Sequence, residues 1–192
     1  SHIGFESAIS ADCWTLSRSL LAENSPYYET GIKLTYTNHK ENLNLSILAL
    51  NGWQKIQRPD AIQNPSFGLQ LNYKPKSNLS LNYSNFIGSD SPDSSKTLRI
   101  FHNFYMQYDA SKRMGIIAGF DIGQDRRDEI ENASWYSPVL IVRYTANAKT
   151  KIAIRAEQYH DKKNLFIPTE DILGFSTNID RQINDKIQLR LE

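Results

Sequence analysis

From Tyr28 to the end of the chain, apolar residues recur at every second position rather than at every third or fourth. Strict alternation places apolar side chains on one face of a β-strand and polar side chains on the other. Ten runs of this kind are separated by polar segments. They cover residues 28–36, 43–53, 67–73, 79–87, 98–108, 114–122, 136–144, 152–156, 173–179 and 187–191. The pattern predicts an all-β fold, an antiparallel up-and-down meander of about ten strands.

The segments between these runs alternate in length. Residues 37–42, 74–78, 109–113, 145–150 and 180–185 are short and rich in Asn, Lys, Asp and Pro, the residues that tight turns prefer. Longer polar segments lie between them, at about 54–65, 88–97, 123–134 and 161–171. An up-and-down barrel with one trimmed rim and one elaborated rim has this alternation. If such a barrel spans an outer membrane, the short turns would face the periplasm and the long loops the exterior.

The chain divides into two parts by this pattern. Residues 27–192 form a single barrel domain of five hairpins, and residues 1–26 precede it without period-two alternation. The preceding segment enters a strand that runs toward a short turn, so we expect an outer-side loop or a constriction segment in the lumen. Ser1-His2 and Leu191-Glu192 resemble residues left by tag removal and cloning, and we expect a piece truncated at both ends.

The two faces of the expected strands differ in charge. No Asp, Glu, Lys or Arg stands at the apolar positions of the ten runs, although 22% of the chain is charged. The opposite positions carry seven basic and three acidic residues: Glu29, Lys33, Arg99, Asp121, Arg143, Lys151, Arg155, Glu157, Lys186 and Arg190. These positions are otherwise rich in Gly, Ser, Asn and Gln, with little of the Lys, Glu and Thr that usually cover an exposed sheet.

Two interpretations produce such alternation. A soluble barrel or sandwich turns the apolar face inward, whereas a transmembrane barrel turns it toward lipid. Strands of about ten residues suffice to cross hydrocarbon when tilted, and only a closed barrel would satisfy the backbone there. Leu34, Leu45, Leu71, Phe104, Ile116 and Ile154 distinguish the two, since they meet lipid in the membrane barrel and fill a core in the soluble one.

Aromatic residues favour the membrane interpretation. Tyr36, Tyr73, Tyr108 and Tyr144 each precede a short turn, at spacings of 37, 35 and 36 residues. One tyrosine per hairpin at one level predicts an aromatic girdle at a membrane interface. Residues near the other rim predict a second girdle, namely Trp53, Phe67, Phe86 and Tyr136.

Short motifs across nearly the whole chain resemble the OmpL-like porins of Gram-negative outer membranes, the β-barrel porin-2 family. They are Ser17-Arg18-Ser19, Pro26-Tyr27-Tyr28-Glu29-Thr30-Gly31, Asn51-Gly52-Trp53, Pro65-Ser66-Phe67-Gly68, Asn85-Phe86-Ile87-Gly88, Phe101-His102-Asn103-Phe104-Tyr105, Trp135-Tyr136-Ser137-Pro138-Val139 and Arg155-Ala156-Glu157. The resemblance implies a partial transmembrane barrel in the outer membrane of a Gram-negative bacterium. Such porins are longer and usually end in a terminal aromatic, whereas this chain ends in Arg190-Leu191-Glu192.

Within a barrel, the charged face would line the lumen. The expected lumen-lining residues are Glu29, Lys33, Arg99, Asp121, Arg143, Lys151, Arg155 and Glu157. Arg18 and Glu23 are constriction candidates, and an ordinary surface loop is an equal alternative for their segment. The ten charges of this face sum to +4, which suggests a weak anion preference for passively diffusing solutes. Ion pairs such as Arg155 with Glu157 or Lys33 with Glu29 would cancel it.

Other functional classes find little support. The net charge of +1 gives no electrostatic case for nucleic acid, and one cysteine excludes an internal disulfide framework or a multi-cysteine metal site. The chain lacks phosphate-binding, CxxC, HExxH and Gly-x-Ser-x-Gly motifs, and its four histidines have no metal-ligand spacing. We therefore expect no enzyme, cofactor or metal, although His160-Asp161 is the place where a site at the outer rim would begin.

Three functional hypotheses follow. The first is a porin-like barrel whose partners are the lipid bilayer and small solutes. The second is a soluble β-barrel or sandwich that binds a small apolar ligand inside. The third is a structural barrel segment whose long loops bind a partner. Open sheet edges would invite pairing with another chain, which leaves a homo-oligomer open.

Overall fold

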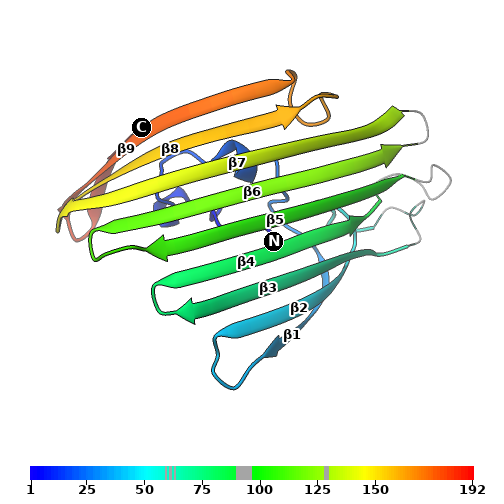
Figure 1. Cartoon of the computed structure of the whole chain (residues 1–192), viewed down its shortest axis with the longest axis horizontal. Helices are drawn as coiled ribbons and strands as arrows, with labels where there is room; N and C mark the ends of the chain where they lie inside the picture. The colour runs from blue at the N-terminus through cyan, green and yellow to red at the C-terminus, as the bar shows by residue number, and fades with distance from the viewer. Residues whose placement is uncertain (59, 61, 63, 90–96, 128–129) are drawn as a thin grey trace.

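The computed structural model describes residues 1–192 except 59, 61, 63, 90–96 and 128–129. Ten strands form one antiparallel sheet in which neighbours in sequence are neighbours in space (Figure 1). The strands are β1 (Gly31–Thr37), β2 (Leu43–Leu50), β3 (Ser66–Lys76), β4 (Leu79–Gly88), β5 (Leu98–Asp109), β6 (Met114–Arg127), β7 (Ile130–Asn147), β8 (Thr150–Asp161), β9 (Asp171–Asn184) and β10 (Ile187–Leu191). The predicted meander is confirmed.

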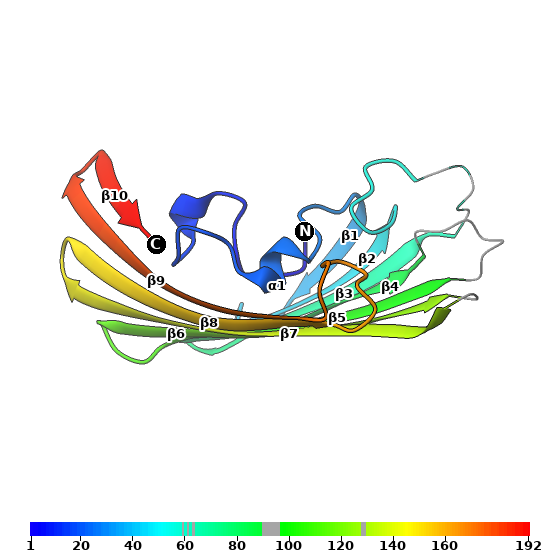
Figure 2. The ribbon, with the colours of Figure 1, turned by 90° about the horizontal axis from the view of Figure 1, so that it is seen from above.

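The sheet is curved like part of a barrel wall but is not closed. Figure 2 shows it from above as an arc with a convex and a concave side. Within the described chain, β1 pairs only with β2 and β10 only with β9, so both strands are edges. The structure is therefore consistent with a partial barrel.

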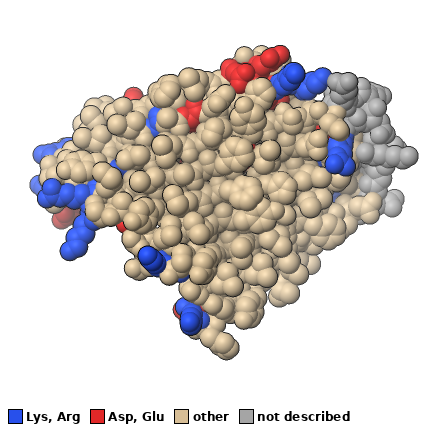
Figure 3. All heavy atoms as spheres, viewed as in Figure 1, with Lys and Arg blue, Asp and Glu red and all other residues tan. Residues whose placement is uncertain are grey.

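The alternation of the sequence separates the two sides of this arc. The convex side carries the predicted apolar positions, and many of their side chains are exposed: Leu34 is 68% exposed, Ile154 57% and Phe104 44%. Figure 3 shows this side, where uncharged residues form the broad middle and charged residues gather toward the margins. Burying so much apolar surface in a core would need a second layer over the convex side, and the described residues provide none.

The concave side holds the polar positions, and most of its strand residues are buried. Buried serine and asparagine residues of six strands line this side. They include Ser46, Ser66, Asn82, Ser84, Asn103, Ser137 and Asn178. They are buried because the N-terminal segment lies in the concavity (Figure 2). This segment contains the 3-10 turn η1 (Ser10–Asp12) and the helix α1 (Leu20–Glu23), whose N-cap Ser19 accepts a hydrogen bond from the backbone N–H of Ala22.

Two apolar clusters also lie on the concave side, which alternation alone does not predict. The first gathers Ile3, Leu48, Leu50, Trp53, Phe86, Phe101, Trp135, Tyr159 and Ile167. The second gathers Trp14, Leu21, Ile117, Val139, Ile141 and Ala153. Both include residues from the N-terminal segment, so this segment completes a core against the concave side of the sheet.

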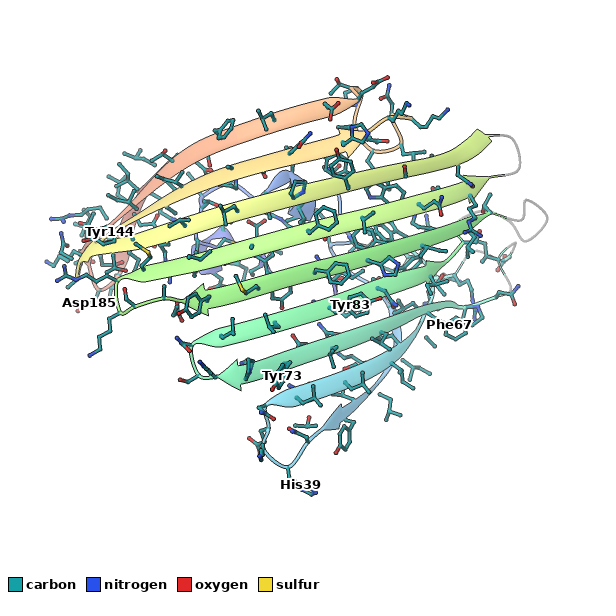
Figure 4. The ribbon with its side chains drawn as sticks, in the orientation of Figure 1. His39, Phe67, Tyr73, Tyr83, Tyr144 and Asp185 are labelled. Carbon is teal, nitrogen blue, oxygen red and sulfur yellow. The ribbon has the colours of Figure 1, made fainter. Side chains whose placement is uncertain are left out.

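This arrangement corrects part of the expected second girdle. Trp53 is 6% exposed and Phe86 is fully buried, and their rings pack edge-on at 5.2 Å on the concave side. Both were predicted at a lipid interface. Phe86 faces inward because its register partner is Gly68, on the concave side of β3. Phe67, at the far end of the sheet from Tyr73 in Figure 4, is 56% exposed on the convex side.

No helix among the described residues has the length and apolar character that crossing a membrane would require.

Candidate functional site: the concave face and the segment lying on it

The eight residues predicted to line a lumen all lie on or beside the concave side. Seven occupy inward positions of strands: Lys33 in β1, Arg99 in β5, Asp121 in β6, Arg143 in β7, and Lys151, Arg155 and Glu157 in β8. Glu29 lies just before β1 and is buried at its side chain. The strand alternation places these charges on one side, and the N-terminal segment then brings partners to several of them.

Arg155 is the most connected of these residues. Its guanidinium forms ion pairs with Glu157 at 3.0 Å and with Glu192 at 3.1 Å. It also donates to the hydroxyl of Thr15 at 3.1 Å and to the backbone oxygen of Ser17 at 2.8 Å. A second nitrogen donates to the hydroxyl of Ser17 at 2.9 Å. A buried guanidinium is tolerated when carboxylates pair with it and other oxygen acceptors surround it in this way.

The two carboxylates around Arg155 bind the backbone of the same segment. Glu157 accepts from the N–H of Leu20 at 2.7 Å, and Glu192 accepts from the N–H of Ser17 at 2.6 Å. The sequence alone identified Arg155 and Glu157 as a pair that could cancel. The sequence did not reveal that this pair also anchors residues 17–20, which precede the sheet in the chain.

Arg190 and Asn178 form a second anchor, which holds residues nearer the start of the segment. Arg190 pairs with Asp180 at 2.6 Å and donates to the backbone oxygens of Ser10 and Cys13, the latter at 3.0 Å. Asn178, fully buried, accepts from the N–H of Leu16 at 3.0 Å.

Arg143 holds the same stretch of chain by a different interaction. Its guanidinium lies 4.0 Å from the ring centroid of Trp14, an arrangement that gains cation–π energy. The Trp14 ring fits against Gly115, where an added Cβ would come within 2.6 Å of it. The indole therefore needs a glycine at this point of β6.

At the long-loop end, Arg99 is enclosed by aromatic rings. It forms a two-point ion pair with Asp125, at 2.7 and 2.9 Å, and lies 4.9 Å from the centroid of Trp53 and 5.3 Å from that of Phe166. Asp125 was not predicted as a site residue, although it lies directly opposite Arg99 in the register of β5 and β6. This charge is therefore paired and covered.

Asp121 lies deeper in the same half of the concave side. One carboxylate oxygen accepts from the side chain of Asn103 at 2.5 Å, and Asn103 in turn accepts from the backbone N–H of Gly4 at 3.1 Å. The other oxygen has no hydrogen-bond partner within the described structure, nor does the hydroxyl of Tyr159.

The first residues of the chain lie over β4 and beside Glu29, just before β1. The His2 ring lies 2.5 Å from Glu29 and 2.7 Å from the backbone oxygen of Asn85. Lys33, expected to pair with Glu29, donates instead to the side-chain oxygen of Gln70 at 2.9 Å.

Arg18 and Glu23, the two constriction candidates, lie close together. Their ion pair measures 3.3 Å, and Arg18 lies 4.0 Å from the ring centroid of Tyr27, whose hydroxyl donates to Glu23 at 2.8 Å. Arg18 and Tyr27 line a cavity of about 420 Å³ between the first residues of the chain and residues 18–27. Burial raises the pKa of Glu6, which also lines this cavity, although Ser19 donates two hydrogen bonds to it.

The four tyrosines lie on the opposite, convex side near the short turns. Figure 4 shows Tyr73 and Tyr144 at the ends of β3 and β7 that carry these turns, with His39 and Asp185 at turn tips beyond. Tyr36 is 61% exposed, Tyr144 42% and Tyr73 40%, and Tyr108 is half-buried.

The fold and this distribution of side chains define a class. A meander with an apolar convex side, a polar concave side and one short-turn rim is the wall of a membrane-type β-barrel. The profile of the β-barrel porin-2, OmpL-like family matches residues 1–192, the whole chain, and the chain belongs to this family. The porin resemblance seen in the sequence is confirmed. No curated protein matches the chain at a significant level.

Family membership supports a porin-like β-barrel of the outer membrane that serves transport and meets a membrane and small solutes. It also points to a transporter rather than an enzyme.

Proposed function

We propose that this chain forms the wall of a passive diffusion channel for small polar solutes in the outer membrane of a Gram-negative bacterium, and that it has no catalytic activity. The observation that supports this proposal is the direction of the side chains: apolar side chains are exposed on the convex side, and the charged strand residues lie on the concave side. The soluble alternative requires the reverse, because a small apolar ligand would need Leu34, Phe104 and Ile154 to face inward.

The N-terminal residues 1–26 are proposed as the constriction, distinct from the barrel wall of residues 27–192. Their support is the set of anchors that bind them to the concave side: Arg155, Glu157, Asn178 and Arg190. A segment fixed in the lumen narrows the path for solutes. Arg18 lines the cavity within this segment, and Glu23 pairs with it, so both lie where solutes would pass.

A weak anion preference is proposed from the charges that remain without carboxylate partners. Arg99, Arg155 and Arg190 are neutralised by adjacent carboxylates. Lys33 and Lys151 are exposed on the concave side and form no ion pair within the described structure. A small excess of positive charge along a lumen favours anions.

Closure of the barrel requires partners for the edges β1 and β10. The homo-oligomer that the sequence left open would provide them through pairing between copies. Native mass spectrometry in detergent tests this point. A discrete dimeric mass would support pairing between copies, and a monomeric mass would contradict the proposed homo-oligomer.

The test of function is conductance in planar bilayers containing the purified chain. We expect voltage-independent steps and a reversal potential that indicates modest selectivity for chloride over potassium. Replacing Lys33 and Lys151 by Gln should move that potential toward zero, whereas Lys55→Gln, outside the concave face, should leave it unchanged. Arg155→Met, which removes the donors that hold Thr15 and Ser17 to the concave side, should enlarge the steps. An absence of steps in a chain shown to be folded and inserted would overturn the channel proposal.

A further inference from the structure

The two rims of the sheet differ in charge. The five short segments defined above contain seven Lys and Arg residues against four Asp and Glu, whereas the four long segments contain seven against ten. Of the four acidic residues, Asp180 points to the concave side and pairs with Arg190. The rim with the short turns is therefore basic, whereas the long segments carry an acidic excess in the sequence.

The basic residues of this rim are available to a partner. All seven are exposed, and none of them forms an ion pair within the described structure. They are Lys40, Lys74, Lys76, Lys112, Arg113, Lys149 and Arg181. Each of the five short segments contributes at least one, so the charge follows the whole rim.

These cations lie just beyond the four tyrosines. Lys40 follows Tyr36 by four residues, and Lys74 follows Tyr73 directly. In Figure 3, blue side chains gather at the margin where Figure 1 places the short turns of β1–β2, β3–β4 and β7–β8. An aromatic ring at the edge of an apolar band marks the level of the bilayer interface, and flexible cations beyond it reach the headgroups.

We propose that this short-turn rim binds the phosphate groups of anionic phospholipids in the leaflet that surrounds it. The proposal rests on the proposed function, because it requires the convex side to lie in a bilayer. A line of separated, exposed cations spread over five turns matches a planar array of headgroups. No cavity that the structure describes brings these cations together, which argues against a single soluble anion as the ligand.

The magnitude follows from the charge count. Each Lys or Arg near an anionic membrane surface strengthens binding by about fivefold at low salt. Neutralising three of the seven should therefore lower the preference for anionic lipid by at least about tenfold, even if the contributions overlap.

The test uses the full chain reconstituted in vesicles, with Tyr144→Trp as a reporter at the rim. Quenching of its fluorescence is compared between brominated phosphatidylglycerol and brominated phosphatidylcholine at equal mole fractions. The native tryptophans are buried on the concave side and supply a constant background. We expect stronger quenching by the anionic lipid, a difference that 0.5 M salt reduces, as screening requires at roughly this ionic strength.

Two triple variants separate rim charge from total charge. Lys76→Gln, Lys112→Gln and Lys149→Gln together should abolish most of the preference. Lys55→Gln, Arg126→Gln and Lys162→Gln together remove the same charge from the long-loop rim and should leave it intact.

The outcomes distinguish failure of this inference from failure of the channel proposal. Equal quenching by both lipids, or an equal loss in the two triple variants, would overturn lipid recognition by the rim. Loss of the preference on adding inorganic phosphate at constant ionic strength would overturn it in favour of a free-anion site. No quenching by either lipid would mean that the convex side is outside the bilayer, which contradicts the proposed function itself.

Discussion

Replacing Arg155 by Met should release the N-terminal segment from the concave side. The Arg155 side chain is 6% exposed, and its removal leaves Glu157 buried at 6% side-chain exposure without its cation. It also removes the donors that reach Thr15 and Ser17. Breaking a buried ion pair by deleting one partner costs about 3–5 kcal/mol. The strands should remain paired, because Met can occupy the same inward position of β8.

The segment provides its own reporters for this loss. The backbone N–H groups of Ser17 and Leu20 donate to Glu192 and Glu157, so their hydrogen exchange reports opening of the segment. If the free energy that holds the segment on the sheet falls by about 3–5 kcal/mol, hydrogen exchange at these amides becomes roughly 100-fold faster or more. Amides of the central strands, such as that of Ile117, should be unaffected.

A matched control and a double variant make the result interpretable. Lys33→Met removes a concave-side cation that is exposed and donates only to Gln70, so it should accelerate exchange by less than about fivefold. Glu157→Gln combined with Arg155→Met should cost less than the sum of the two single changes, because the double variant has no Glu157 carboxylate to leave without its cation. Exchange at Ser17 and Leu20 that is unchanged in Arg155→Met would refute the anchoring role.

Three further predictions concern the same segment and the faces of the sheet. The pKa of Glu6 is raised in the folded chain, so protonated Glu6 stabilises docking of the segment below its ordinary pKa of 4.5, and this stabilisation is lost as the pH rises through the folded pKa. Glu6→Gln should therefore strengthen the protection of residues 1–26 from hydrogen exchange at pH 7 and flatten the pH dependence of that protection. Cys13 is 8% exposed and burial raises its pKa, so alkylation of its thiol should be slow in the native chain. The alkylation rate should be at least tenfold higher in Arg190→Met, which lacks the donor to the backbone oxygen of Cys13, and the rate in denaturant serves as the reference. Phe101→Ala should lower the free energy of unfolding in detergent by about 3–5 kcal/mol, because Phe101 is buried on the concave side. Phe104→Ala on the convex side should lower it by less than about 1 kcal/mol, because detergent replaces the lost contacts. Equal losses in the two variants would contradict the assignment of these residues to opposite faces.

The sequence was sufficient for the fold because the period-two signal is both local and sustained. Once alternation fixes which side chains share a face, an up-and-down meander follows from short turns between successive runs. The prediction that Leu34, Phe104 and Ile154 share the side opposite Arg155 needs only this parity. The inward positions of Arg99 and Asp121 follow from it in the same way.

The contacts of the N-terminal segment could not be predicted in this way. The partners of Arg155 are separated from it by more than 130 residues in the case of Thr15 and Ser17, and no local pattern records such pairing. Lys33 was expected to pair with Glu29, its neighbour in parity, but His2 occupies that carboxylate. Trp53 and Phe86 were predicted at a lipid interface because they are aromatic and near a rim. Their inward packing depends on the residues that cover them.

The most direct test of the account is a comparison of two adjacent residues, Leu34 and Lys33, which lie on opposite sides of β1. Each is replaced in turn by a spin-labelled cysteine in a Cys13→Ser background, and the chain is reconstituted in vesicles. The collision rates of the label with oxygen, which concentrates in lipid, and with a water-soluble nickel chelate are then measured. The account predicts that the label at Leu34 meets oxygen and the label at Lys33 meets nickel. A label at Leu34 that meets nickel as readily as the label at Lys33 would contradict a lipid-facing convex side.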